Sequence, residues 1–176
     1  GSCPAKAIIR PASTEEVSKV LALCHEANQT IIPQAGMTGL ADATKATEAD
    51  FVLSLERMRA IEQLDTQGAT ALVQAGVVVE DLQKTAAEHD LLFAVDWGAR
   101  GSAQVAGMLA ANAGGNKVIR YGMARDQVLG LEVVLADGTV LTNLKETIKD
   151  NTGYDLKQLF IGSEGTLGII TRAVLR

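Results

Sequence analysis

Histidine, cysteine and aromatic residues are scarce in this sequence, and their scarcity excludes several kinds of protein. Its 176 residues include two cysteines, Cys3 and Cys24, two histidines, and only 3% aromatics. Two cysteines cannot build a disulfide framework or a four-cysteine zinc site, so no metal is predicted. We predict a reducing compartment, cytoplasmic or matrix-like, with the cytoplasm preferred. His25 and His89 fall on predicted amphipathic helices, far in sequence from the glycine-rich segments, and neither is predicted to be catalytic.

Positive charge and long apolar runs are lacking too. The net charge of −5 would repel a phosphate-rich polymer, so nucleic acid is not a predicted partner. No run reaches the roughly 18 apolar residues of a membrane helix, so no transmembrane segment is predicted. Apolar residues still make up 47% of the chain, enough for a buried core and a globular fold.

Hydrophobic periodicity predicts an α+β fold of two lobes. The first lobe, about residues 3–58, is expected to be a small parallel strand–helix–strand unit, with Ser13 and Glu16 forming a capping box. The second, about residues 59–176, is expected to be larger and mostly antiparallel, with flanking helices and a type I′ hairpin turn at 137–138. Strands are predicted at 7–10, 30–33, 51–55, 61–64, 69–75, 128–135, 139–141 and 167–175. Helical segments are predicted from Ser13 to near His25 and at 79–89, 104–111 and 154–160.

Glycine is abundant, with 17 residues, and is concentrated with alanine between 98 and 122. Such small side chains indicate that the backbone passes close to something large. Three segments carry candidate chemistry. The first follows a strand and has no Lys or Arg before Thr44, so a phosphate there would be held by backbone N–H groups and by the Thr38 hydroxyl. The alternative is an ordinary turn. This segment comprises Pro33, Gln34, Ala35, Gly36, Met37, Thr38, Gly39 and Leu40.

The second segment runs from Asp96 to Gly115. A helix that starts near Gln104 would direct free N–H groups back toward Ser102 and would suit a pyrophosphate, while Asn112 offers a donor and an acceptor to a heterocycle. Tight helix–sheet packing selects the same small residues and remains the alternative. The third segment, 162–171, places Glu164 in a glycine-rich turn before a strand. That carboxylate could accept from a ribose hydroxyl or hold the loop.

The order of these motifs resembles one family. The stretches are Pro33–Leu40, Asn112–Gly115 with Arg120-Tyr121-Gly122, and 150–156 leading into 161–171. Together they resemble the vanillyl-alcohol-oxidase (PCMH-type) FAD-binding fold, and within it the flavin-dependent D-2-hydroxyacid dehydrogenases, a group that includes the D-lactate and D-2-hydroxyglutarate dehydrogenases and the glycolate oxidase flavin subunit. The segment 129–138 also reads like that group.

The resemblance implies that two lobes grip FAD. The matching loop has no His or Cys to attach the flavin, so binding is expected to be non-covalent. Oxidation of a 2-hydroxyacid to a 2-oxoacid would need a C-terminal substrate domain that this chain lacks, so the chain is expected to contain no catalytic residue and to be inactive alone. Its uncovered surface is expected to favour a homodimer. Besides Pro33–Leu40, the implied FAD contacts are Gly101, Ser102, Gly107, Met108, Asn112, Ala113, Gly114, Gly115, Tyr121, Gly122, Glu164, Gly165, Gly168, Ile169 and Ile170.

Two other functions remain as alternative hypotheses. Ala35, Ala106 and Ala111 stand where members of the family usually carry other residues, glycine at the first two positions. A positive φ at Ala35 would cost about 1–2 kcal/mol. A scaffold that keeps the fold but has lost FAD is therefore the alternative function. A nicotinamide-binding Rossmann enzyme fits less well, because no GxGxxG follows a strand.

Overall fold

The computed structural model describes residues 4–176, so Cys3 lies outside the described residues. The first lobe contains a three-stranded sheet of β1 (Ala7–Ile9), β2 (Ile31–Gln34) and β3 (Phe51–Ser54). All its pairs are parallel, which confirms the predicted parallel unit. β3 lies between the other two strands, however, so the strand–helix–strand unit does not bring its own strands into contact.

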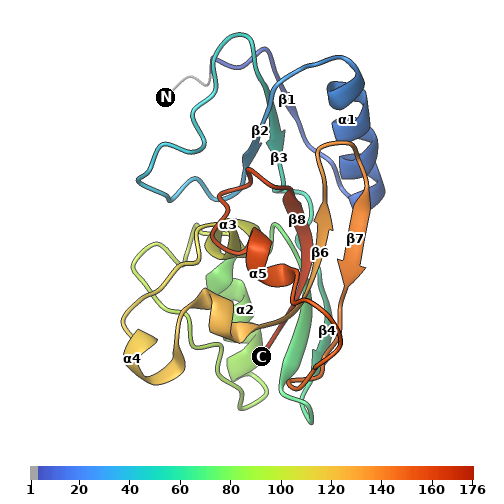
Figure 1. The fold of residues 1–176 in the computed structure, drawn as a ribbon. Coiled ribbons are helices and arrows are strands. Elements are labelled where there is room, and N and C mark those ends of the chain that lie inside the picture. Colours follow the sequence, from blue (N-terminus) through green and yellow to red (C-terminus); the bar gives the residue numbers. More distant parts are fainter. Residues whose placement is uncertain (1–3) are drawn as a thin grey trace.

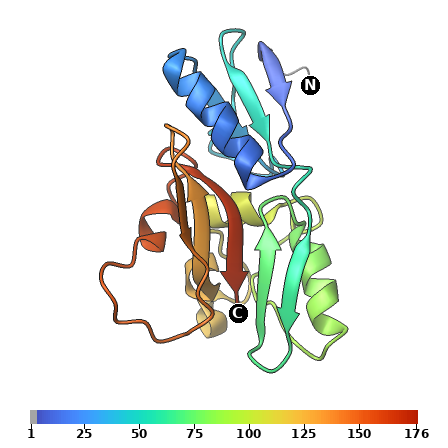
Figure 2. The same ribbon diagram turned by 90° about the vertical axis from the view of Figure 1, so that its right-hand side faces the viewer.

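Helix α1 (Thr14–Glu26) begins where the sequence predicts. The Ser13 hydroxyl accepts from the Glu16 N–H at 3.3 Å, but the Glu16 carboxylate accepts from the N–H of Ala12 rather than that of Ser13. Val17 and Leu21 are buried on one face. Figures 1 and 2 show α1 beside the small sheet, with one end close to the larger sheet.

The second lobe is built on a five-stranded sheet that is antiparallel throughout. Its order is β4-β5-β8-β6-β7, so the last strand of the chain fills the centre. A small parallel sheet joined to a larger antiparallel one is the predicted fold class. The strands are β4 (Ile61–Asp65), β5 (Thr70–Gln74), β6 (Val128–Val134), β7 (Val140–Asn143) and β8 (Ile169–Leu175).

The hairpin between β6 and β7 forms, but its predicted turn type is wrong. Gly138 has a φ of +87°, whereas Asp137 has no positive φ, and a type I′ turn needs both. The Gly138 N–H donates to the Leu135 carbonyl at 2.9 Å, so the left-handed glycine follows a tight turn one residue earlier. A Cβ on Gly138 would lie 2.7 Å from the Ser18 carbonyl oxygen of α1, which also explains the glycine.

Short helices complete the second lobe. α2 (Val79–Ala87) and α3 (Val105–Ala110) were predicted, and α5 (Lys157–Phe160) is shorter than the predicted helical segment. α4 (Val118–Tyr121) and the 3₁₀ turn Ala124–Gln127 were not among the predicted helical segments. Within residues 4–176, no helix combines the length and the apolar character needed to cross a membrane.

Candidate functional site

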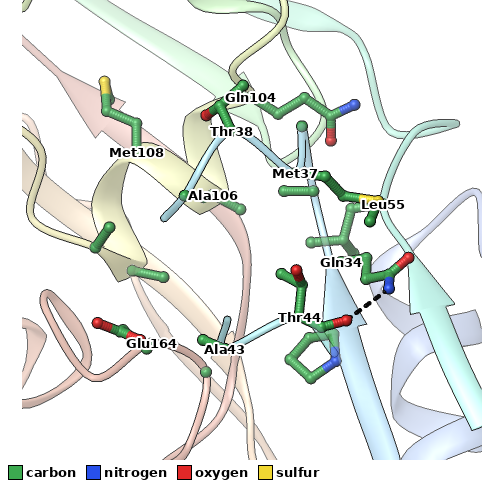
Figure 3. Close-up of a pocket in the computed structure, with 18 of the residues that line it drawn as sticks. Gln34, Met37, Thr38, Ala43, Thr44, Leu55, Gln104, Ala106, Met108 and Glu164 are labelled. Atoms are coloured by element: carbon green, nitrogen blue, oxygen red, sulfur yellow. Dashed lines mark hydrogen bonds between the residues drawn. The ribbon is translucent and has the colours of Figure 1, made fainter. Parts of the chain in front are cut away.

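A cleft of about 280 Å³ lies where three distant parts of the chain meet. They are the loop after β2, the helix α3 with its flanks, and the turn that precedes β8 (Figure 3). Sixteen of the predicted FAD contacts line it: all of Pro33–Leu40, with Gly107, Met108, Ala113, Glu164, Gly165, Gly168, Ile169 and Ile170. The fold thus brings together residues from all three segments that the sequence singled out.

The loop after β2, residues 35–44, presents an unusual set of free donors. Within residues 4–176, none of its backbone N–H groups donates a hydrogen bond to another protein group. Met37 and Asp42 adopt a left-handed backbone, with φ of 52° and 61°. A left-handed residue within a turn makes neighbouring N–H groups converge, and such a concavity binds anions. The Gln34 side chain donates to the Thr44 carbonyl at 2.9 Å and ties the two ends of this loop together (Figure 3).

Ala35 does not carry the strain that a positive φ would bring, because its φ is not positive. Its methyl group faces Gly107, where an added Cβ would lie 3.1 Å away. Gly36 is held more tightly, since a Cβ there would lie 2.2 Å from the Ser102 carbonyl oxygen. The loop therefore packs directly on the segment that leads into α3.

The start of α3 presents fewer free N–H groups than the sequence predicted. Within residues 4–176, the N–H of Gly107, which lines the cleft, donates to no other protein group, but two others are taken. The N–H of Val105 donates to the Val77 carbonyl and that of Ala106 to the Ala75 carbonyl, each at 2.9 Å. The connection from β5 to α2 runs beside the helix start and takes these donors, an arrangement that a local pattern does not reveal. The helix is also only six residues long. Any anion in the cleft would depend mainly on the loop after β2.

The turn before β8 forms the opposite wall. Glu164 has a φ of 52°, and its N–H donates to the Ala110 carbonyl at 2.9 Å. A Cβ on Gly165 would lie 2.7 Å from the Pro33 ring, so the turn reaches across to β2. Arg125 holds this wall in place, because its guanidinium donates to the Ile161 carbonyl at 2.7 Å. Of the described residues that line the cleft, Glu164 alone is charged.

Seven predicted contacts do not line this cleft. The side-chain oxygen of Asn112 accepts from the backbone N–H of Arg125 at 3.0 Å, so the acceptor that was predicted to meet a heterocycle, though not the donor, already has a protein partner. Tyr121 lines a separate hollow with Leu92 and Ile119. Gly115 packs on the Asp96 backbone, where a Cβ would lie 2.0 Å from the carbonyl oxygen. The other four are Gly101, Ser102, Gly114 and Gly122. Contact with FAD stays a prediction at these seven positions, as it does at the sixteen positions that line the cleft.

The cleft also contains residues that were not predicted to contact a ligand. Ala106, Ala110 and Ala111 belong to the small-residue segment, and the helical periodicity of α3 could have indicated them. Gln104 precedes that helix, and the sequence does not show whether its side chain is paired. Leu55, just after β3, and Trp97 gave no comparable signal. The others are Ala41, Ala43 and Thr44.

Gln104 is unusual among these residues. Its side chain is buried, with 7% of the residue exposed, and lies among the cleft residues in Figure 3. Its Oε1 atom has no hydrogen-bond partner among the described residues. A concave site with free backbone donors and an unpaired buried amide oxygen suits a ligand that contains both phosphate and hydroxyl groups. FAD contains both, so the residues present fit this cofactor.

Comparison with known proteins also indicates FAD as the ligand. The family model described as "FAD binding domain" matches residues 5–143. Mitochondrial D-2-hydroxyglutarate dehydrogenase of Bos taurus is 48% identical over 166 residues, which cover 94% of this chain and 30% of that protein. D-2-hydroxyglutarate dehydrogenase of Stutzerimonas stutzeri is 42% identical over 97% of this chain and 37% of its own length.

A solved structure shares the fold. Alkyldihydroxyacetonephosphate synthase superimposes with a TM-score of 0.83 at 30% identity, over 96% of this chain and 33% of its own. The chain therefore spans about a third of the length of the proteins it matches. Their names describe whole proteins, while the matched family model describes this part of them. The chain belongs to the FAD-binding domain family of PCMH-type flavoproteins, and its cofactor is FAD.

Proposed function

We propose that this chain supplies the FAD site of a flavoenzyme that oxidises a D-2-hydroxyacid to a 2-oxoacid. The observation that carries the proposal is the loop after β2, whose unpaired N–H groups line a cleft together with Gln104 and the turn before β8. Relatives named D-2-hydroxyglutarate dehydrogenase support this substrate class. When bound, FAD supplies the two-electron acceptor for the oxidation.

The residues of the cleft have binding roles in this proposal. The N–H groups of residues 35–44 would hold the pyrophosphate, and Glu164 would accept from a ribose hydroxyl. Ligand pockets commonly measure about 300–1,000 Å³, so FAD would extend beyond a cleft of about 280 Å³. The seven predicted contacts outside it would meet those further parts of the cofactor. No His or Cys lines the cleft within the described residues, so we propose non-covalent FAD.

Substrate binding and proton transfer belong, in this proposal, to polypeptide beyond the present chain. The chain covers only 30% of the bovine relative, and Glu164 is the one titratable side chain among the described cleft residues. The partner would be a substrate domain that closes over the flavin. The bovine relative is named as mitochondrial, so a mitochondrial compartment stands beside the predicted cytoplasmic one.

The first test is a visible absorbance spectrum of the purified chain after addition of FAD and desalting. We expect a retained flavin spectrum, because the loop donors can bind the pyrophosphate without help from another chain. Acid precipitation should release the flavin into the supernatant, as non-covalent binding requires. Addition of D-2-hydroxyglutarate or D-lactate should leave the flavin absorbance unchanged.

Three outcomes would contradict the proposal in different ways. A chain that never retains flavin would favour the scaffold alternative. Flavin that stays with the acid precipitate would exclude non-covalent binding. Bleaching of the flavin by a 2-hydroxyacid would show that this chain contains a complete active site, contrary to the division of roles proposed above.

Self-association is a second expectation. Several large apolar side chains near the cleft face solvent: Leu40 is 99% exposed, and Met37, Leu159 and Leu167 are each more than half exposed. Clustered apolar surface favours association. We expect the FAD-free chain to form dimers as its concentration rises, measured by light scattering coupled to size exclusion. A monomeric mass at every concentration would refute this expectation.

A further inference from the structure

We propose that the Gln104 side chain binds the cofactor directly, with Oε1 accepting a hydrogen bond from a sugar hydroxyl that neighbours the pyrophosphate. The proposal rests on the function proposed above and assigns one hydroxyl contact within it. Gln104 is not among the residues that the sequence motifs indicated.

Gln104 differs from the other buried glutamines in its hydrogen bonding. Three glutamines are buried in the described residues: Gln34, Gln104 and Gln127. Gln34 donates to the Thr44 carbonyl and Gln127 to the Tyr121 carbonyl. Only the Oε1 atom of Gln104 is a buried side-chain polar atom without a partner among residues 4–176. An unpaired buried acceptor is unfavourable, and a ligand that donates to it removes the penalty.

The hydrogen-bonding chemistry of an amide oxygen limits which groups of FAD can bind to Oε1. An amide oxygen only accepts hydrogen bonds, and the phosphate oxygens of FAD at neutral pH also only accept. Oε1 therefore cannot bond to the pyrophosphate itself. The backbone of Gln104 lies directly against the loop that would hold the pyrophosphate, since a Cβ on Gly36 would lie 3.0 Å from the backbone nitrogen of Gln104. In FAD the groups that flank the pyrophosphate are the ribityl chain and the ribose, and both carry hydroxyl donors.

Replacement of Gln104 with leucine tests the contact, because leucine has a similar size and no acceptor. We expect FAD affinity, measured by flavin fluorescence titration, to fall about tenfold, which corresponds to one neutral hydrogen bond. The thermal midpoint of the FAD-free chain should stay the same or rise, since an unpaired polar group is removed. A glutamine with only a structural role would show the opposite pattern.

Gln127→Leu is the matched control. Gln127 is an equally buried glutamine that is already paired and lies outside the cleft. We expect this variant to lower the thermal midpoint while the FAD dissociation constant changes less than about twofold. Gln104→Leu should therefore weaken FAD binding without loss of stability, and Gln127→Leu should lower stability without weakening FAD binding.

FAD analogues identify the hydroxyl. Wild type and Gln104→Leu are each titrated with FAD lacking single ribityl hydroxyls and with FAD lacking the ribose 2′-hydroxyl. We expect one analogue to bind wild type about tenfold more weakly and to bind both proteins equally. Equal FAD affinity of wild type and Gln104→Leu would overturn this inference alone. Failure of wild type to bind FAD at all would overturn the proposed function, and this inference with it.

Discussion

Replacing Gly36 with alanine is expected to weaken FAD binding about 100-fold and to destabilise the FAD-free chain by about 3 kcal/mol. The added Cβ would lie 2.2 Å from the Ser102 carbonyl oxygen and 2.8 Å from the Ala103 Cα, and both neighbours are backbone atoms that no rotamer change can move. The loop of residues 35–44 must then lift away from α3. Flavin titration and thermal melting measure the two effects, and a fall of about 6–12 °C is expected for a chain of this size.

Gly39→Ala is the control within the same loop. A Cβ on Gly39 meets no atom within 4 Å, and its φ lies outside the left-handed region. We expect its thermal midpoint to stay within about 2 °C of wild type, since the change is exposed and unstrained. If Gly36→Ala retained wild-type affinity and stability, the close packing of the loop against the start of α3 could not be a requirement of the site.

Local patterns in the sequence predicted most helices and strands. They could not predict the order of the strands in the sheets, because that order depends on pairing between distant segments. Ser13 and the spacing of Val17 and Leu21 predict α1, because a cap and a 3.6-residue period depend only on neighbouring residues. The position of β3 between β1 and β2, and of β8 between β5 and β6, depends on pairing between distant segments. No periodicity within one strand contains that information.

The same distinction applies to the cleft. The resemblance implied that the loop of residues 33–40 holds the pyrophosphate, and the lack of a nearby cation implied that backbone N–H groups would do so. The pairing of the Val105 and Ala106 N–H groups could not be predicted, because their acceptors are the carbonyls of Val77 and Ala75, about 30 residues earlier. Gln104 likewise gives no sequence signal. Whether a buried amide is paired depends on what the fold places beside it.

A buried carboxylate that joins the lobes was not predicted either. Glu132 on β6 is 3% exposed and accepts from the Thr14 hydroxyl of α1 at 2.6 Å. Arg172 and Thr171 of β8 also donate to it, at 2.6 Å and 2.9 Å. The cleft lies between the same two lobes, so this network helps to fix the two walls that bind FAD.

Glu132→Gln should lower the free energy of unfolding at pH 7 by about 3 kcal/mol, measured with urea. Removing one partner of a buried ion pair is strongly destabilising, because Arg172 loses its main counter-charge. Burial alone would raise the pKa of the Glu132 carboxyl, but the hydrogen bonds from Arg172, Thr14 and Thr171 outweigh burial. They lower the pKa from its ordinary value of 4.5 to about 2.

The pH dependence follows from this lowered pKa. A carboxyl whose pKa is lower in the folded chain stabilises the fold fully above its unfolded pKa of 4.5. That stabilisation is lost progressively as the pH falls from 4.5 toward 2, where the folded carboxyl also becomes protonated. The gap in stability between wild type and Glu132→Gln should therefore be widest above pH 5 and should narrow steadily toward pH 2.

Glu62→Gln separates this effect from a general loss of acidic charge. Glu62 also pairs with Arg172, at 3.3 Å, but its side chain is 24% exposed and solvent screens the contact. We expect this variant to lose less than about 1 kcal/mol, as exposed ion pairs usually do. Two results would contradict the role that these contacts indicate for the buried carboxylate. One is an equal loss of unfolding free energy in the two variants. The other is a difference in stability between wild type and Glu132→Gln that stays constant from pH 7 to pH 2.5. A large loss for Glu132→Gln alone, accompanied by weaker FAD binding, would show that the geometry of the cleft depends on a contact outside it.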